Sequence, residues 1–456
     1  MKRRQICFSI VFLFFSVGFP VYAAFNPLSI SDSSSIREDI YYTWLTRSLD
    51  DLREEKAIIR KNEAGDYFRV SFVEYEKEFA IICNPMVEND FPEKTSGSWI
   101  LYRDKETEKA LRIEFYFTQS SEVYFTFKPS GTKTSIDLRI FNAYLIKDHN
   151  FSLPFRDFYT LSIPQFYALS KNLFPWHFFT PEEKLYDANI QIASQLREYQ
   201  DMIDFVPNRA YDENGKPSQI FDSSENLELN TRDNIESNEI LEDSDKLQLG
   251  SLGYVKWVVD GLVYPQIASY LKIQALKKAT VDTSPRSRVE TLSSRETIYA
   301  ALDWTRNLAT AYASVQLGRD LDFFTSGTEV NHSFFSLSFD SHGKVRDSAY
   351  VKNSGYSSHI LKPLLYMLAL TEPERMYIAA IKDFRSDTEE GKLDIGRFRD
   401  ALVFLPYFDA KREFQCPVFY AGKEINLDEL IANSENDFFS LVRIKTELRF
   451  YPLKKE

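Results

Sequence analysis

The run Leu249-Gly250-Ser251-Leu252-Gly253-Tyr254-Val255-Lys256-Trp257 decides the fold of the second half of the chain. Apolar residues recur along it at helical spacing, at Leu252, Val255, Val259 and Leu262. This spacing predicts a helix that Pro265 bends or ends. A hydroxyl group at a helix start lies among unpaired N–H groups at the positive end of the macrodipole, which favour a developing anion. Ser251 is therefore a candidate nucleophile, and the alternative is that its hydroxyl only caps the helix.

Helices precede strands in the region that follows this run. Ser293-Ser294-Arg295-Glu296 forms a capping box for a long helix that ends near Gly318. Strand patterns at His332–Phe339 and Lys344–Tyr350 then flank a turn, and later strands are expected at 376–381 and 441–451. Helices first and an antiparallel sheet after them predict an α+β domain over residues 247–456.

The first part of the chain alternates between apolar and polar residues with a period of two. The alternation is clear at Leu111–Phe117, Val123–Phe127 and Ile136–Ile140, with turn residues between these segments. Such segments are typical of half-buried antiparallel strands. We therefore expect a β-rich, sandwich-like domain over residues 24–170.

Two connecting segments separate the predicted domains. Thr180-Pro181-Glu182-Glu183 is a helix start, so a helix should run to about Ile203 within a helical connector at residues 171–210. From Tyr211 to Lys246 the composition shifts to Asp, Glu, Asn and Ser. We expect an acidic, solvated linker over residues 211–246.

The N-terminus has the features of a cleavable signal peptide over residues 1–23. Lys2, Arg3 and Arg4 precede an apolar run from Ile6 to Phe19, and Ala23 ends a small-residue cleavage site. The apolar run is shorter than the roughly 20 residues that a spanning helix needs. The mature protein is expected in the periplasm or outside the cell, with no transmembrane span after cleavage.

Composition excludes several classes of function. A formal net charge of -12 argues against a nucleic-acid partner, because phosphate binding needs a basic face. The 5 histidines do not follow metal-ligand spacing, and the 15 glycines form no phosphate-binding loop, so no metal and no cofactor are expected. The mature chain keeps two cysteines, Cys83 and Cys416, which either pair or pack in the cores.

The segment Gly250–Trp257 resembles the signature of the NlpC-type papain-like cell-wall peptidases, in which an Asp-Cys-Ser-Gly-Phe-Val stretch puts cysteine at a helix start. Gly253, Tyr254 and Val255 match the second half of that signature, and Ser251 stands where the family has cysteine. The resemblance implies a papain-like α+β fold, a histidine that begins a strand, and a polar residue on the next strand. His332 and Asp347 occupy these places, and His359 is an alternative base.

The departures from the family leave three functions open. Serine needs strong base assistance where cysteine is already partly thiolate, so the first is a degenerate NlpC-like domain that binds cell-wall peptide or a related amide. The second is a peptidoglycan hydrolase with Ser251 as nucleophile, His332 as base and Asp347 as orienter. The third is a periplasmic scaffold without a small-molecule site. The expected partner is accordingly a peptidoglycan peptide or an envelope protein.

Overall fold

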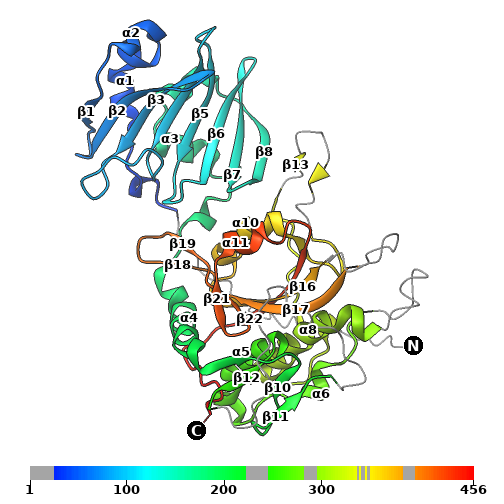
Figure 1. Ribbon diagram of the computed structural model, residues 1–456. Coiled ribbons are helices and arrows are strands. Elements are labelled where there is room, and N and C mark those ends of the chain that lie inside the picture. Colours follow the sequence, from blue (N-terminus) through cyan, green and yellow to red (C-terminus); the bar gives the residue numbers. More distant parts are fainter. Residues whose placement is uncertain are drawn as a thin grey trace, which may run out of the picture.

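The computed structural model describes residues 25–221, 245–281, 295–335, 338–339, 345–346, 350–383 and 396–455. An antiparallel sheet forms the N-terminal part, and helices with a second sheet form the C-terminal part (Figure 1). This mixed architecture confirms the predicted α+β class. The expected signal peptide lies outside the described residues. None of the described helices is both long and apolar enough to cross a bilayer.

The N-terminal sheet is an antiparallel meander in which each strand pairs with the next one along the chain. Its strands are β1 (Ile58–Lys61), β2 (Tyr67–Glu74), β3 (Glu78–Pro85), β4 (Trp99–Asp104), β5 (Ala110–Tyr116), β6 (Val123–Ser130), β7 (Lys133–Ile140) and β8 (Ala143–Phe151). The alternation in the sequence therefore predicted real strands. They form one eight-stranded sheet, however, and not the two facing sheets of a sandwich.

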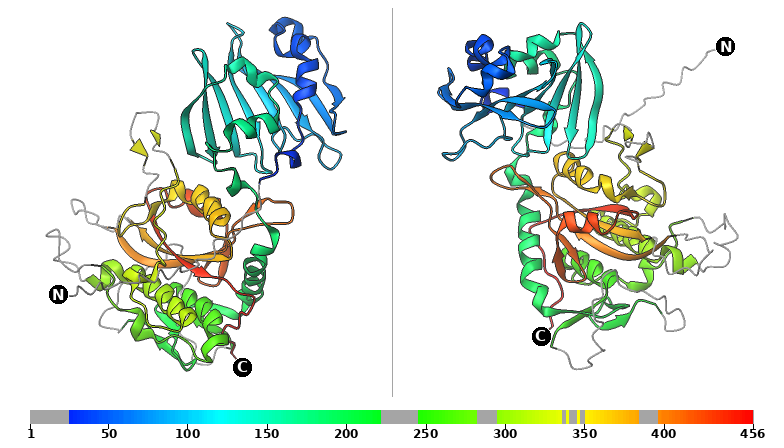
Figure 2. Two further views of the ribbon diagram at one scale, coloured as in Figure 1. Left: turned by 180° about the vertical axis from the view of Figure 1, so that it is seen from behind. Right: turned by 45° about the horizontal axis from the view of Figure 1, so that its top comes forward.

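Short helices cover one face of this sheet (Figure 2). They are η1 (Pro27–Ser29), α1 (Ser34–Asp39), the π-helical turn η2 (Tyr41–Leu45), α2 (Leu49–Arg53), η3 (Phe155–Tyr159) and α3 (Ile163–Ser170). Aromatic rings fill the layer between them: Phe127 stacks on Phe158, and Phe125 meets Phe166 edge to face. The residues on one face of the sheet are therefore buried, and helices, not a second sheet, cover this face.

The α-helix of the connector packs along the side of the C-terminal part (Figure 1), whereas Trp176, ahead of it, packs against Phe125 of the N-terminal sheet. The connector contains η4 (Trp176–Phe179), η5 (Glu183–Tyr186), α4 (Asp187–Tyr199), η6 (Gln200–Met202) and β9 (Ile203–Phe205). The regular α-helix begins at Asp187, later than the Thr180 start that the sequence indicated. Its apolar face is buried as expected, with Ile192 and Leu196 inaccessible to solvent. Asn189 ties the helix to the sheet by donating to the carbonyls of Arg375 and Pro406.

The C-terminal sheet has six strands in the order β15-β22-β16-β17-β20-β21. Its strands are β15 (Tyr356–Ser357), β16 (Arg375–Asp383), β17 (Arg397–Phe404), β20 (Val418–Tyr420), β21 (Lys423–Ile425) and β22 (Phe438–Lys445). Both faces are covered, which makes three layers. On one face lie α5 (Ser251–Ile267), α6 (Ile273–Leu276) and α8 (Arg295–Leu317); on the other lie η8 (Ser358–Ile360), α10 (Leu361–Thr371) and α11 (Leu427–Ala432).

Small elements complete the C-terminal part: β10 (Arg209–Tyr211), β11 (Pro217–Gln219), β12 (Leu247–Leu249), α9 (Phe323–Ser326), β13 (Ser338–Phe339), β14 (Val345–Arg346), β18 (Tyr407–Phe408) and β19 (Phe414–Gln415). The expected hairpin is present as β13 paired with β14, but His332 precedes it and lies outside any strand. The start of the expected acidic linker is also structured, because Tyr211 ends β10 and pairs with Pro217 of β11.

Most of helix α5 is deeply buried. Every residue from Ser251 to Val263 is buried. The helix meets backbone directly, because a Cβ atom built on Gly253 would lie 2.0 Å from the carbonyl oxygen of Arg209 in β10. A Cβ atom on Gly261 would lie 2.5 Å from the ring of Phe450. Glycine at these positions therefore sets how closely the chain can pack around α5.

A charged pair is enclosed within the same helix. Lys256 and Asp260 form an ion pair with side chains only 1% and 5% exposed. Asp260 also accepts a hydrogen bond of 2.9 Å from the backbone N–H of Leu271. Burial raises the pKa of Asp260 to about 6, although Lys256 acts in the opposite direction. Because the two charges pair with each other, the buried part of the helix can carry two ionisable groups.

The substitution Gly253→Ala tests the backbone contact. In an ordinary helix interior this change stabilises a protein by about 0.5–1 kcal/mol. Here the methyl group would collide with Arg209, so we expect a loss of about 3 kcal/mol in the free energy of unfolding, measured by urea denaturation. Gly318→Ala is the control, because open space surrounds that position and only its φ of +62° opposes alanine. Stabilisation by Gly253→Ala would contradict the close approach of β10.

The substitution Lys256→Met tests the buried pair through pH. A carboxyl group whose pKa is raised by folding adds stability that is present below its unfolded pKa and is lost as pH rises through its folded pKa. Without Lys256 the pKa of Asp260 should rise beyond about 6. The free energy of unfolding should therefore fall by about 2–3 kcal/mol between about pH 5 and pH 8. Lys256→Met/Asp260→Asn should remove this pH dependence; an equally steep slope in the double variant would refute the assignment.

Candidate functional site

Ser251 is the first residue of α5 but does not cap it. The N-cap position belongs to Gly250, whose backbone is extended with φ -81° and ψ 174°. The carbonyl of Gly250 accepts from the N–H of Tyr254 at 2.8 Å and so begins the helix. The cap that the sequence offered as the alternative role of Ser251 is therefore not the role that its hydroxyl takes.

The Ser251 hydroxyl instead points to the sheet. Its Oγ donates to Oδ1 of Asp400 on β17 at 2.9 Å, and both residues are buried, with exposed fractions of 7% and 5%. Asp400 lies at an irregularity in the pairing of β16 with β17, between Ile381 and Lys382. The irregularity changes the local direction of side chains. The residue that meets Ser251 is thus a carboxylate supplied by a strand of the sheet on which α5 packs.

Asp400 was missed by the sequence analysis. The signal that could have found its strand is the apolar run from Ala401 to Leu405, which follows Phe398 and has the length of a buried strand. Nothing local distinguishes this aspartate from the many others in an acidic chain. Its role comes from its pairing with Ser251, 149 positions away along the chain.

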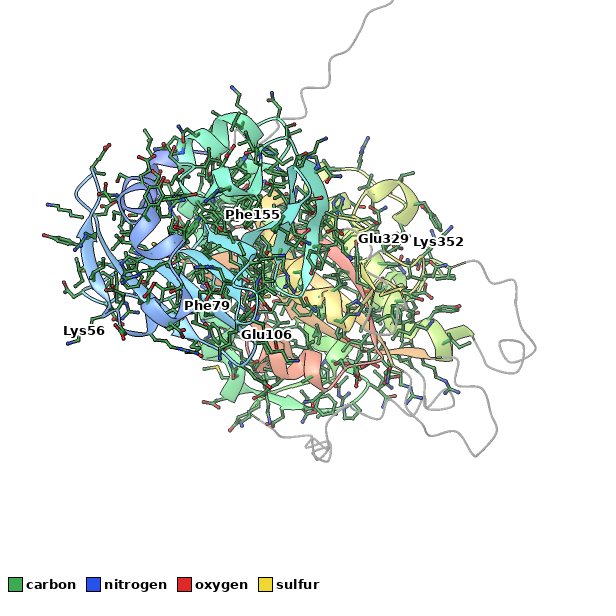
Figure 3. The ribbon with its side chains drawn as sticks, turned by 90° about the horizontal axis from the view of Figure 1, so that it is seen from above. Lys56, Phe79, Glu106, Phe155, Glu329 and Lys352 are labelled. Atoms are coloured by element: carbon green, nitrogen blue, oxygen red, sulfur yellow. The ribbon has the colours of Figure 1, made fainter. Side chains whose placement is uncertain are left out.

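His332 lies in a different part of the molecule, at the β22 edge of the sheet. Its Nε2 is 2.8 Å from Oε1 of Glu372, the residue that follows α10, and Tyr356 donates to its backbone carbonyl. Arg443 of β22 donates to Oε2 of the same glutamate at 2.9 Å. Glu329, which is labelled in Figure 3, pairs with β22 beside this group. The imidazole is therefore already oriented by the carboxylate of Glu372.

The structure does not bring Ser251 and His332 together. On β16, Tyr377 pairs with Arg443 of the His332 group, and Ile381 pairs with Asp400, the partner of Ser251. These two positions on β16 are four residues apart. Four residues span about 13 Å, and β17 and β22 are a further two strand spacings apart, about 10 Å. In addition, Ser251 begins a helix on one face of the sheet, whereas Glu372 follows a helix on the other face.

Of the other candidates for the base and its orienter, the structure describes only His359. Asp347, the expected orienter, lies outside the described residues, as does His342. The alternative base, His359, receives or donates a 2.7 Å hydrogen bond at Nδ1 with Ser357, and its carbonyl accepts from Asn142 of the N-terminal part. It belongs to the contact between the two parts. Cys83 and Cys416 are both free, so they do not tie these parts together.

The electrostatics of the two clusters differ. At the sheet edge, burial would raise the pKa of Glu372, but the hydrogen bond with His332 and the charge of Arg443 lower it overall. At the α5 start, a serine hydroxyl faces a carboxylate. The hollow beside it measures about 10 Å³, roughly the room for one water molecule. In the described ranges there is no group of three or more His, Cys, Asp or Glu side chains placed to hold a metal ion.

The arrangement around Ser251 is chemically poor for acyl transfer. A serine hydroxyl needs a partner that can take up its proton near neutral pH, a task usually given to an imidazole. Here the partner of Ser251 is the carboxylate of Asp400 and not an imidazole. The hydrogen bond from Ser251 to Asp400 therefore acts as a buried polar tie between α5 and β17.

Comparison with known proteins covers only the first part of the chain. A family model described as a domain of unknown function, DUF8515, matches residues 26–178. This range takes in the eight-stranded sheet and its covering helices. No curated protein and no solved structure matches the chain.

Proposed function

We propose that the protein is an exported protein of the cell envelope whose C-terminal domain is a degenerate NlpC-like domain that binds cell-wall peptide or a related amide without cleaving it. The observation that carries the proposal is the 2.9 Å hydrogen bond from Ser251 to Asp400. On this proposal, the hydroxyl and the carboxylate stand in for the family's nucleophile and base. The charged and apolar residues at the N-terminus of the sequence support export.

We interpret the pair of Ser251 and Asp400 through the resemblance to the NlpC-type family. In the family, cysteine begins the helix and a histidine lies on a strand of the following sheet. Ser251 begins α5, and Asp400 lies on a strand of the sheet against which α5 packs. On this proposal both reactive side chains have been replaced, sulfur by oxygen and imidazole by carboxylate, while the scaffold that held them is kept.

Hydrolysis by Ser251, His332 and Asp347 is the less favoured function. It would require His332 to reach Ser251 from the opposite face of the sheet, where Glu372 already holds its imidazole. It would also require room for a substrate, and the hollow beside Ser251 takes about one water molecule. Binding without turnover does not require His332 to reach Ser251.

The double substitution Ser251→Cys/Asp400→His tests the proposal by restoring both groups. If the two positions are the former nucleophile and base, the imidazole should lower the pKa of the new thiol, as histidine does in cysteine proteases. We expect iodoacetamide to modify the double variant at about pH 6 at least tenfold faster than Ser251→Cys alone. The measurement is the rate of mass increase of the intact protein.

The native cysteines give a low background in this experiment. Burial raises the pKa of the Cys83 thiol to about 12, and burial likewise raises that of Cys416. Asp400→His alone is the matched control, because it carries the new imidazole and only the native thiols. Equal alkylation rates in Ser251→Cys and the double variant would count against a former catalytic pair at these positions.

A further inference from the structure

A pocket of about 450 Å³ lies against the face of the C-terminal sheet opposite α5. Four strands contribute one apolar or aromatic side chain each to its floor: Ile381, Leu402, Tyr420 and Ile425. Helix α11 forms its wall. The volume falls within the range of pockets that hold small organic ligands, about 300–1,000 Å³.

The floor is suited to an apolar ligand body. Ile381, Leu402 and Tyr420 are otherwise buried, with exposed fractions of 2%, 1% and 3%, and they belong to the core under α10. Leu430 of α11 adds an aliphatic group from the wall. These apolar side chains at the base and wall of the pocket can contact the hydrocarbon part of a ligand.

The rim carries a negative charge. Glu429 is exposed and lines the pocket, and its carboxylate makes no hydrogen bond or ion pair within the part of the chain that the structure describes. No lysine or arginine is among the pocket-lining residues of the described ranges. A carboxylate at the mouth of an apolar pocket attracts a cation and repels an anion, and the net charge of -12 acts in the same direction.

Two amide side chains complete the rim. Oδ1 of Asn426 caps α11 by accepting from the N–H groups of Asp428 and Glu429 at 2.8 and 3.1 Å. The cap fixes the orientation of Asn426 and leaves its Nδ2 group to donate. Asn433 lies at the other end of α11 and also lines the pocket. Amides at both ends of the wall can bind a neutral polar group of a ligand.

We propose that this pocket binds a small amphipathic amine, with an apolar body on the sheet and a protonated amino group at Glu429. The charge-assisted hydrogen bond between the ammonium and the carboxylate fixes the orientation of the ligand, and the apolar side chains of the pocket contact its hydrocarbon body. The inference goes beyond the proposed function. It concerns the opposite face of the sheet from Ser251 and does not depend on whether that residue is catalytic.

Calorimetric titration of the full mature chain tests the pocket with three eight-carbon probes: octylamine, octanol and octanoate. Octylamine should bind at least tenfold more tightly than octanoate, with octanol between them. Glu429→Gln should weaken octylamine about tenfold and change octanol less than twofold. Glu435→Gln is the matched control, because Glu435 is exposed just after α11 and does not line the pocket.

A pocket-filling substitution identifies the place of binding. Ile425→Trp adds a large ring at the partly buried end of the floor and should abolish binding of all three probes while circular dichroism stays unchanged. Equal affinity for octylamine and octanoate, or no effect of Glu429→Gln, would overturn the proposal. Octylamine binding should persist in Ser251→Cys/Asp400→His, so failure here is separate from failure of the proposed function.

Discussion

The close packing of α5 is the constraint on which the C-terminal part depends. A helix buried all round can be placed only where its neighbours approach it at backbone distance, and Gly253 permits this for β10. Trp304 of α8 donates to the carbonyl of Leu252 from the other side. With α5 held in this way, its first residue has little freedom. Ser251 faces β17, and its hydroxyl donates to Asp400.

Such rigid support suits an active site, and we propose that here it remains at a site without catalysis. A catalytic residue must be held within a fraction of an ångström by its support, and α5 provides such support. With a hydroxyl and a carboxylate in place, the same geometry yields a buried hydrogen bond that stabilises the contact between helix and sheet. The other face of the sheet offers more room for a ligand, since its pocket of about 450 Å³ has an apolar floor and a charged rim.

Local sequence patterns predicted the helices and strands well. What the sequence did not predict depends on contacts between residues that are far apart in the chain. The spacing from Leu252 to Leu262 and the alternation from Leu111 to Ile140 indicated elements that the structure contains. The eight-stranded sheet was expected to face a second sheet, because alternation shows that a face is buried but not what covers it. The hairpin of β10 and β11 was missed since its polar composition resembles a linker. Asp400 could not be assigned, because only the folded chain brings it to Ser251.

The most direct test is whether the purified protein cleaves muropeptides, with the products followed by mass spectrometry and binding measured in parallel. We predict binding with no cleavage, because the hydroxyl of Ser251 is hydrogen-bonded to a buried carboxylate and not to an imidazole. Cleavage by the wild-type protein that disappears in Ser251→Ala would contradict it. That result would mean that Ser251 is an active nucleophile and that the hydrogen bond to Asp400 is broken during the reaction.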